Sequence, residues 1–132
     1  MSGTTPAVAM RVLPEPYVIC QLERNQLIDL PRNAGSLYAL TRTSDEVSLV
    51  CAEADMPTNT TKQEPGWSAL MVEGPMDFAL TGVLAAIAAP LAEARIPIFA
   101  ISTYDTDYVL VRQAVLASAI TVLEMHHHTI RR

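Results

Sequence analysis

One continuous block, from Phe78 to Val111, constrains the fold of this chain more than any other part of the sequence. It reads FALTGVLAAIAAPLAEARIPIFAISTYDTDYVLV: a glycine-bearing turn, an alanine-rich segment, an apolar run, an acidic loop and a second apolar run. In the alanine-rich segment, Val83, Ile87 and Leu91 recur at spacings of four, which predicts a helix over residues 81–94 with one broad buried face. The turn before this helix and the loop after the strand are expected at one end of a sheet.

The two apolar runs of the block predict a pair of strands. Ile96–Ile101 is apolar without alternation, which is typical of a strand covered on both faces, although Pro97 favours an edge position at that end. The short connection to Tyr108–Val111 predicts an antiparallel hairpin. Pro90 lies inside the helical pattern and is expected to remove one backbone hydrogen bond and kink the helix.

The segments that flank this block complete a recognisable unit. Trp67–Glu73 predicts a strand before it, Gln113–Met125 predicts a second helix after it, and 126–130 predicts a weak edge strand. The resulting order, βαββαβ, predicts an α+β, ferredoxin-like sandwich with both helices on one face of an antiparallel sheet.

The first half of the chain resembles a shortened copy of the same unit. Strands are predicted at Tyr17–Leu22 and Val47–Cys51, with a short helix over Gly35–Thr41 between them. Residues 1–16, which contain three prolines, are expected to form an extended lead-in. The polar segment 57–66 is predicted to be a linker. The expected organisation is therefore an abbreviated subdomain over residues 17–56 and a complete one over residues 67–130.

Composition excludes several classes of function. The chain has 132 residues, of which 50% are hydrophobic and 17% are charged, so one compact domain or two very small ones are expected rather than disorder. The net charge is −5, no basic run occurs and aromatic residues make up 5%, which argues against a nucleic-acid partner. The longest apolar stretch, Phe78–Ala92, is shorter than the roughly 20 residues that a membrane span needs, so no membrane association is expected.

The N-terminal sequence and the two cysteines predict a cytoplasmic protein. The first ten residues, MSGTTPAVAM, lack the basic region and apolar stretch of a signal peptide. Cys20 and Cys51 each lie in an apolar, strand-like run. They would be close enough for a disulfide if the strands are neighbours, but two reduced and buried thiols are the favoured interpretation.

The turn before the predicted helix is the first candidate binding element. It runs from Pro75 to Gly82, and the unpaired N–H groups at a helix start attract a carboxylate, helped by the helix dipole. Gly82 would allow a ligand to approach the backbone closely. The alternative is structural, with Thr81 capping the helix and Gly82 relieving packing.

The loop after the predicted strand is the second candidate. Asp105 and Asp107 are two residues apart, so in an extended chain both carboxylates would point to one side and could receive an ammonium or guanidinium group. A solvated turn is the alternative. Two aspartates among hydroxyl groups fall short of a magnesium or calcium motif, and no metal is expected.

The histidine run near the end of the sequence and the standard catalytic motifs bear on whether the chain holds a metal or is an enzyme. The three consecutive histidines 126–128 cannot all face one ion, so they are expected to belong to a solvated tail. No nucleophile elbow, P-loop or dinucleotide-binding glycine motif is present. An enzyme is therefore not expected, nor is a cofactor.

Two strings resemble a known family when taken together with their spacing. They are LTGVL, which begins at Leu80, and STYDTDYVLV, which begins at Ser102. With RTSDEVSLVCAE in the first half (residues 42–53) and the Gly66–Trp67 pair, they resemble the ACT-domain proteins of the CASTOR-like group, including short bacterial two-ACT proteins. The resemblance covers roughly residues 15–125. It implies two ACT-like ferredoxin folds, the first abbreviated, in a regulatory module that binds amino acids and associates through its sheets, here as a homodimer.

The resemblance also implies which residues hold the ligand. Carried over by motif, the turn and the loop supply Leu80, Thr81, Gly82, Val83, Leu84, Ser102, Thr103, Tyr104 and Asp107. Asp107 resembles the carboxylate that holds the ligand. The arginine sensors of the group have an acidic residue in the turn where this chain has Leu80, so a neutral or smaller amino acid fits at least as well as arginine.

These features lead to two hypotheses about function. The first is a non-enzymatic, cytoplasmic amino-acid sensor in which helix-start amides bind the ligand carboxylate and Asp107 binds its ammonium group. The alternative is a structural interaction or dimerisation module whose ligand pocket is vestigial.

Overall fold

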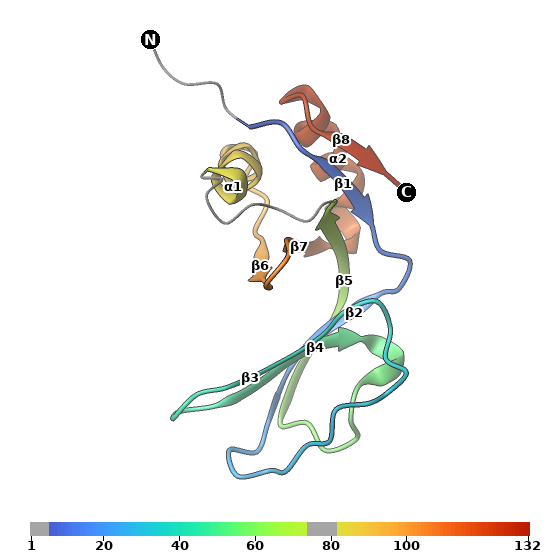
Figure 1. The fold of residues 1–132 in the computed structure, drawn as a ribbon, viewed down its shortest axis with the longest axis vertical. Coiled ribbons are helices and arrows are strands. Elements are labelled where there is room, and N and C mark those ends of the chain that lie inside the picture. The colour runs from blue at the N-terminus through green and yellow to red at the C-terminus, as the bar shows by residue number, and fades with distance from the viewer. Residues whose placement is uncertain (1–5, 74–81) are drawn as a thin grey trace. The chain divides into compact units, whose positions relative to one another are not determined.

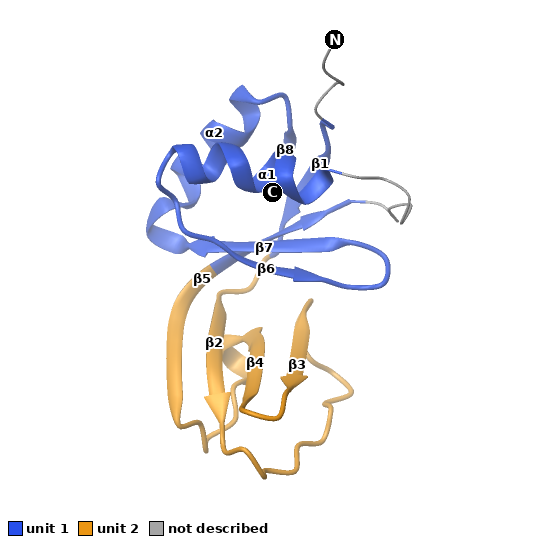
Figure 2. Ribbon diagram, turned by 90° about the vertical axis from the view of Figure 1, so that its left-hand side faces the viewer, with its two compact units in different colours: residues 1–13, 68–132 blue, residues 14–67 orange. Residues whose placement is uncertain are grey.

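The computed structural model describes residues 6–73 and 82–132, and the chain divides into two compact units (Figures 1 and 2). Unit 2 comprises residues 14–67, and unit 1 comprises residues 1–13 together with residues 68–132. Strand β5 (Lys62–Val72) belongs to both, because its first six residues lie in unit 2 and the rest in unit 1. Each unit is described by itself below.

Unit 1 has the predicted order of elements. After β5 come α1 (Val83–Glu93), β6 (Phe99–Ser102), β7 (Asp107–Arg112), a 3-10 turn (Gln113–Val115), α2 (Leu116–Met125) and β8 (Thr129–Arg131). The predicted hairpin is confirmed, because β6 and β7 pair antiparallel from Phe99↔Leu110 to Ser102↔Asp107. The α+β, ferredoxin-like fold is therefore confirmed as well.

The sheet of unit 1 contains one strand that the sequence analysis did not foresee. Its order is β6-β7-β5-β1-β8, where β1 (Ala9–Val12) is antiparallel to β5 and parallel to β8. The interpretation of residues 1–16 as a lead-in was wrong for this stretch. Met10 is fully buried while Arg11 is exposed, but an alternation of only four residues between prolines is a weak signal.

The core of unit 1 lies between the sheet and the two helices. Its buried side chains come from three strands, both helices and the α1–β6 connection: Met10, Leu70, Val72, Val83, Ile87, Leu91, Ile96, Val109, Val111, Ala119 and Leu123. Within the described part of the chain, no helix is long and apolar enough to cross a membrane.

Strand β6 is an edge strand rather than a covered central one. Among the described strands it pairs only with β7, and its residues alternate between half-buried and exposed. The continuous apolar run misled the prediction because Ile96 and Ile98 pack into the core before the strand begins. Only the edge position indicated by Pro97 agrees with the structure.

Both helices of unit 1 end in the same hydrogen-bonded turn. The residues after the C-caps, Arg95 and His127, have φ of 62° and 72°, in the left-handed region where glycine is usual. The next amide reaches back to the helix in both cases, from Ile96 to the carbonyl of Leu91 (2.9 Å) and from His128 to that of Leu123 (3.1 Å). These Schellman turns point the chain back toward the core.

Unit 2 has the strand order of unit 1 without its helices. Strands β2 (Tyr17–Leu22), β3 (Tyr38–Arg42), β4 (Val47–Ala52) and the start of β5 are arranged as β3-β4-β2-β5, with antiparallel pairing throughout. Unit 1 has the corresponding order, β6-β7-β5-β8, when β1 is left out. In unit 2 an irregular segment over residues 23–37 and a 3-10 turn (Glu53–Asp55) stand in place of the two helices.

The short helix predicted over Gly35–Thr41 is absent, because these residues enter strand β3. Tyr38 and Leu40 pack against the buried cluster of β2 and β4, while Ala39 and Thr41 point the other way. This spacing of two is the period of a strand. The predicted segment is so short that its apolar residues do not distinguish the period of a helix from that of a strand.

The cysteines lie in the buried cluster of unit 2, unpaired, on neighbouring strands. Burial raises the pKa of the Cys20 thiol. It also raises the pKa of Cys51 to about 12, with a further contribution from Cys20. The prediction of two buried, unpaired thiols is confirmed, and thiols that resist ionisation are poor nucleophiles.

The predicted linker is partly a strand, and a bulge at its end explains its glycine. β5 begins at Lys62, and its first residues pair with β2. Gly66 has φ of +85°, the register with β2 shifts beside it, and its amide donates to the Glu53 carboxylate at 2.8 Å.

Replacement of Gly66 by alanine tests the backbone conformation alone. A Cβ at this position would meet nothing within 4 Å, so no steric clash contributes. The positive φ should nevertheless lower the free energy of unfolding by about 1–2 kcal/mol. Denaturant titration measures this cost, and an unchanged stability would show that the bulge is not held in the left-handed conformation.

Candidate functional site

The predicted turn is described only from Gly82 onward, because Leu80 and Thr81 lie outside the described residues. Gly82 is the N-cap of α1 and has φ of +81°, a conformation that glycine adopts without strain. Its carbonyl accepts the first helical hydrogen bond, from the amide of Ala86 at 2.8 Å. Since the N-cap is Gly82, the alternative in which Thr81 caps the helix does not describe this turn.

The first turn of α1 offers backbone groups rather than side chains. Val83 is buried and Leu84 is partly buried, and both pack in the core of unit 1. The N-cap makes no side-chain hydrogen bond to the helix, and the first turn contains no acidic residue. The positive end of the helix dipole is therefore not neutralised by a side chain of this turn.

The β6–β7 loop is held by hydrogen bonds between its two threonines. The amide of Thr103 donates to the carbonyl of Thr106 at 2.8 Å, and the hydroxyl of Thr103 accepts from the amide of Thr106 at 3.3 Å. These bonds close a turn, so the chain is not extended here. Tyr104, at its tip, is 81% exposed.

The two aspartates of the loop therefore lie in different environments. Asp105 is exposed in the turn, whereas Asp107 is the first residue of β7 and only 7% exposed. The hydroxyl of Ser102, directly opposite in the hairpin, donates to Asp107 Oδ1 at 2.5 Å. The expectation that both carboxylates point to one side was wrong. Asp107 is the buried acceptor.

Thr106 connects the loop to the central strand and was not predicted. Its buried hydroxyl donates to the carbonyl of Val72, near the end of β5, at 2.5 Å. The segment after β5 leads to Gly82, and Figure 2 shows the start of α1 and the β6–β7 turn on the same side of unit 1. The sequence offers one signal for this contact, because Thr106 directly precedes the strand that begins at Asp107.

His128 is the second residue that the sequence analysis missed. It was assigned to a solvated tail, but its side chain is only 4% exposed. Its Nδ1 lies 3.2 Å from the amide of Val8 and its Nε2 lies 3.0 Å from the carbonyl of Ala86. The cause is the Schellman turn at His127, which directs the next residue inward. Among the described residues, no three His, Cys, Asp or Glu side chains converge as metal ligands.

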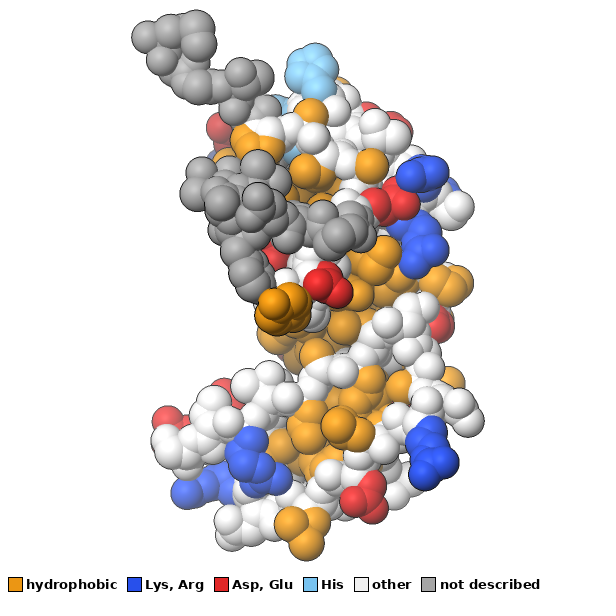
Figure 3. All heavy atoms as spheres, viewed as in Figure 1, with side chains coloured by type: hydrophobic (Ala, Val, Ile, Leu, Met, Phe, Trp, Pro, Cys, Tyr) orange, Lys and Arg blue, Asp and Glu red, His pale blue; other side chains and the backbone are white. Residues whose placement is uncertain are grey.

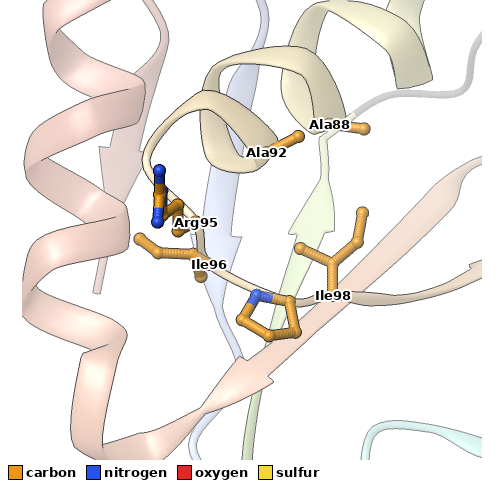
Figure 4. Close-up of a pocket in the computed structure, with 6 residues that line it drawn as sticks. Ala88, Ala92, Arg95, Ile96 and Ile98 are labelled. Atoms are coloured by element: carbon orange, nitrogen blue, oxygen red, sulfur yellow. The ribbon is translucent and has the colours of Figure 1, made fainter.

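A hollow of about 410 Å³ lies at the other end of α1. Figure 4 shows Ala88 and Ala92 on the helix and Ile96 and Ile98 on the connection to β6, and Arg95 and Pro97 complete the lining. The predicted ligand residues that the structure describes do not contribute to this hollow. Its lining is apolar apart from Arg95, so it does not offer the paired polar groups that an amino acid needs.

Charged side chains of both signs are mixed on one face of the described part of the molecule. On the face shown in Figure 3, the Lys and Arg side chains are scattered and interspersed with Asp and Glu. A nucleic-acid site would gather basic side chains into a band. This face is in keeping with the net charge of −5.

Comparison with protein families identifies the two parts of the chain. Residues 62–125 match the ACT domain family, and residues 15–59 match a family described as an N-terminal domain. The chain is 31% identical over 109 residues to the cytosolic arginine sensor for mTORC1 subunit 1 of Bos taurus, and 30% identical to the human protein. The alignment covers 74% of this chain but 33% of those relatives, so the chain spans about a third of their length.

Solved structures support the same assignment. Protein Atu0741 from Agobacterium tumefaciens superposes with a TM-score of 0.85 at 32% identity, covering 95% of this chain and 92% of that one. The aspartate kinase of Clostridium acetobutylicum gives a TM-score of 0.67 at 13% identity, covering 96% of this chain and 36% of the kinase. The second likeness shows a shared fold.

Proposed function

Because this chain belongs to the ACT-domain proteins, we propose that it is a non-enzymatic regulatory protein that binds a free amino acid. The observation that carries the proposal is Asp107, a buried carboxylate beside the exposed hydroxyl-rich loop, at the same end of the sheet as the start of α1. The curated relatives are named as arginine sensors, which supports amino-acid recognition as the shared chemistry.

The proposed site binds the two charged ends of an amino acid with two different elements. The amides in the first turn of α1, at Val83 and Leu84, receive the carboxylate, and the helix dipole adds to this attraction. Asp107 receives the ammonium group through a charge-assisted hydrogen bond while Ser102 holds its Oδ1. In addition, Thr103, Tyr104, Leu80 and Thr81 are proposed to line the site with Gly82.

The apolar residue in the turn bears on the identity of the amino acid. The proposed ligand is neutral or small, because Leu80 offers no carboxylate to a guanidinium group. A buried guanidinium without a partner would lose its hydration and gain no ion pair in return. Arginine is therefore expected to bind more weakly here than a neutral amino acid does.

The proposal includes the assembly and the location of the protein. We place it among short bacterial two-ACT proteins, on the strength of the near-complete overlap with Atu0741. The edge strand β6, which pairs only with β7 among the described strands, supports a homodimer that extends the sheet. The printed name of the curated relatives, a cytosolic sensor, supports a cytoplasmic location.

A thermal-shift panel of the twenty common amino acids tests the proposal. A ligand at a hundredfold excess over its Kd should stabilise the protein by about 2.7 kcal/mol, which raises the melting temperature by several degrees. Neutral amino acids are expected to give the largest shifts. If none of the twenty changes the melting temperature at millimolar concentration, the sensor is refuted, and a stable dimer by light scattering would favour the interaction module.

A further inference from the structure

The proline inside α1 leaves one backbone carbonyl without its usual partner. In an α-helix each N–H donates to the carbonyl four residues earlier, so the missing N–H of Pro90 is the donor that Ala86 would have had. Ala86 is only 5% exposed, so water has little access to its surroundings. A buried carbonyl without a donor is costly, and another donor is expected nearby.

His128 supplies that donor. Its Nε2 lies 3.0 Å from the carbonyl of Ala86, and since a carbonyl only accepts, Nε2 must carry the proton. The amide of Val8 only donates, so Nδ1, at 3.2 Å, must be the unprotonated acceptor. The two contacts together fix a neutral imidazole with one tautomer, held between α1 and the residues before β1.

The residues that His128 holds run past the start of α1. We call Pro6–Val8 the N-terminal strap. The carbonyl of Val8 accepts from the amide of Thr129 at 3.0 Å, so both backbone groups of Val8 are bound by consecutive residues near the C-terminus. At the other end of the strap, the ring of Pro6 lies 3.9 Å from the position that a Cβ on Gly82 would occupy.

We propose that His128 is a positioning residue for the amino-acid site: it replaces the helix bond that Pro90 cannot make and holds the N-terminal strap as a wall beside Gly82. This inference rests on the proposed function. His128 does not touch the ligand in this scheme. By fixing the strap, it sets how closely the ring of Pro6 approaches Gly82, and so the access of a ligand to the helix-start amides.

Three substitutions in the full chain separate the two hydrogen bonds of the imidazole. His128→Asn keeps an acceptor at the position of Nδ1, His128→Gln keeps a donor at the position of Nε2, and His128→Phe keeps neither. Amide hydrogen exchange of Val8, followed by NMR, reports on the strap without any ligand. The native protein and the three variants are then titrated with the amino acid that gives the largest thermal shift among the twenty. The titration is done at a temperature where all four proteins are folded.

The asparagine variant is expected to rescue the strap. Val8 should remain protected in His128→Asn, while its exchange should accelerate at least tenfold in His128→Gln and His128→Phe. Affinity should follow Val8 protection, staying within about threefold of the native value for asparagine and falling about tenfold for the other two. Equal exchange in all four proteins, or native affinity in His128→Phe, would overturn the inference while leaving the sensor intact. If the native protein responds to no amino acid, the proposed function fails, and this inference fails with it.

Discussion

Replacement of His128 by phenylalanine is expected to lower the free energy of unfolding by about 2–6 kcal/mol. The substitution keeps an aromatic ring of similar size but removes the hydrogen bonds to the Val8 amide and the Ala86 carbonyl. Each of these groups then loses its partner, the Ala86 carbonyl in a buried place and the Val8 amide in a partly buried one, at a cost of about 1–3 kcal/mol each. Denaturant titration measures the sum. The exposed His126 is the matched control, and His126→Phe should change stability by less than about 0.5 kcal/mol.

A double-mutant cycle with Pro90→Ala identifies the source of this cost. Alanine at position 90 restores an N–H that can donate to the carbonyl of Ala86, so only the Val8 amide depends on His128 in that background. The cost of His128→Phe should therefore fall by about 1 kcal/mol or more when Pro90 is replaced. An equal cost in both backgrounds would mean that the imidazole does not stand in for the missing helix donor.

Replacement of Asp107 by asparagine is expected to reduce amino-acid affinity about thirtyfold or more. Removing one partner of a buried, hydrogen-bonded charge pair costs about 2–5 kcal/mol, because the other charge is left without compensation. Asparagine keeps the size of the side chain and an oxygen that can accept from Ser102, so the hairpin should keep its fold. Isothermal titration with the best-binding amino acid of the panel measures the loss.

The neighbouring aspartate provides the control for this experiment. Asp105 differs from Asp107 by two positions but is exposed in the turn, where solvent and salt screen its charge. Asp105→Asn should leave the affinity within about twofold of the native value. Equal losses in the two variants would point to the overall negative charge of the loop rather than to a specific contact with Asp107.

The parts of the fold with long periodic patterns could be predicted from the sequence. The two helices of unit 1 and the β6–β7 hairpin follow from apolar spacing and a short loop. Strands β1 and β3 could not be recognised, because four or five residues carry too few repeats to distinguish a strand from a lead-in or a helical face. Their pairing partners, which decide the matter, lie elsewhere in the chain.

The candidate site shows the same division between local and distant information. The loop hydroxyls and Asp107 could be predicted because they are adjacent in sequence, although the turn that separates Asp105 from Asp107 depends on the Thr103–Thr106 hydrogen bonds. The role of His128 could not, since it requires a proline in another helix and an amide near the N-terminus. Three consecutive histidines look alike in sequence. A left-handed turn makes one of them a core residue.

The position of β1 between β5 and β8 has a consequence for the order in which unit 1 folds during synthesis. Unit 2 is complete once residue 67 has left the ribosome, but the sheet of unit 1 needs residues 9–12 to meet residues 129–131. Met10, a fully buried core residue, can pair with Val72 once β5 has been made, but β8, the other neighbour of β1, is synthesised only after α1, β6, β7 and α2. The sheet of unit 1 is therefore completed by a pairing between two segments that are far apart in the sequence.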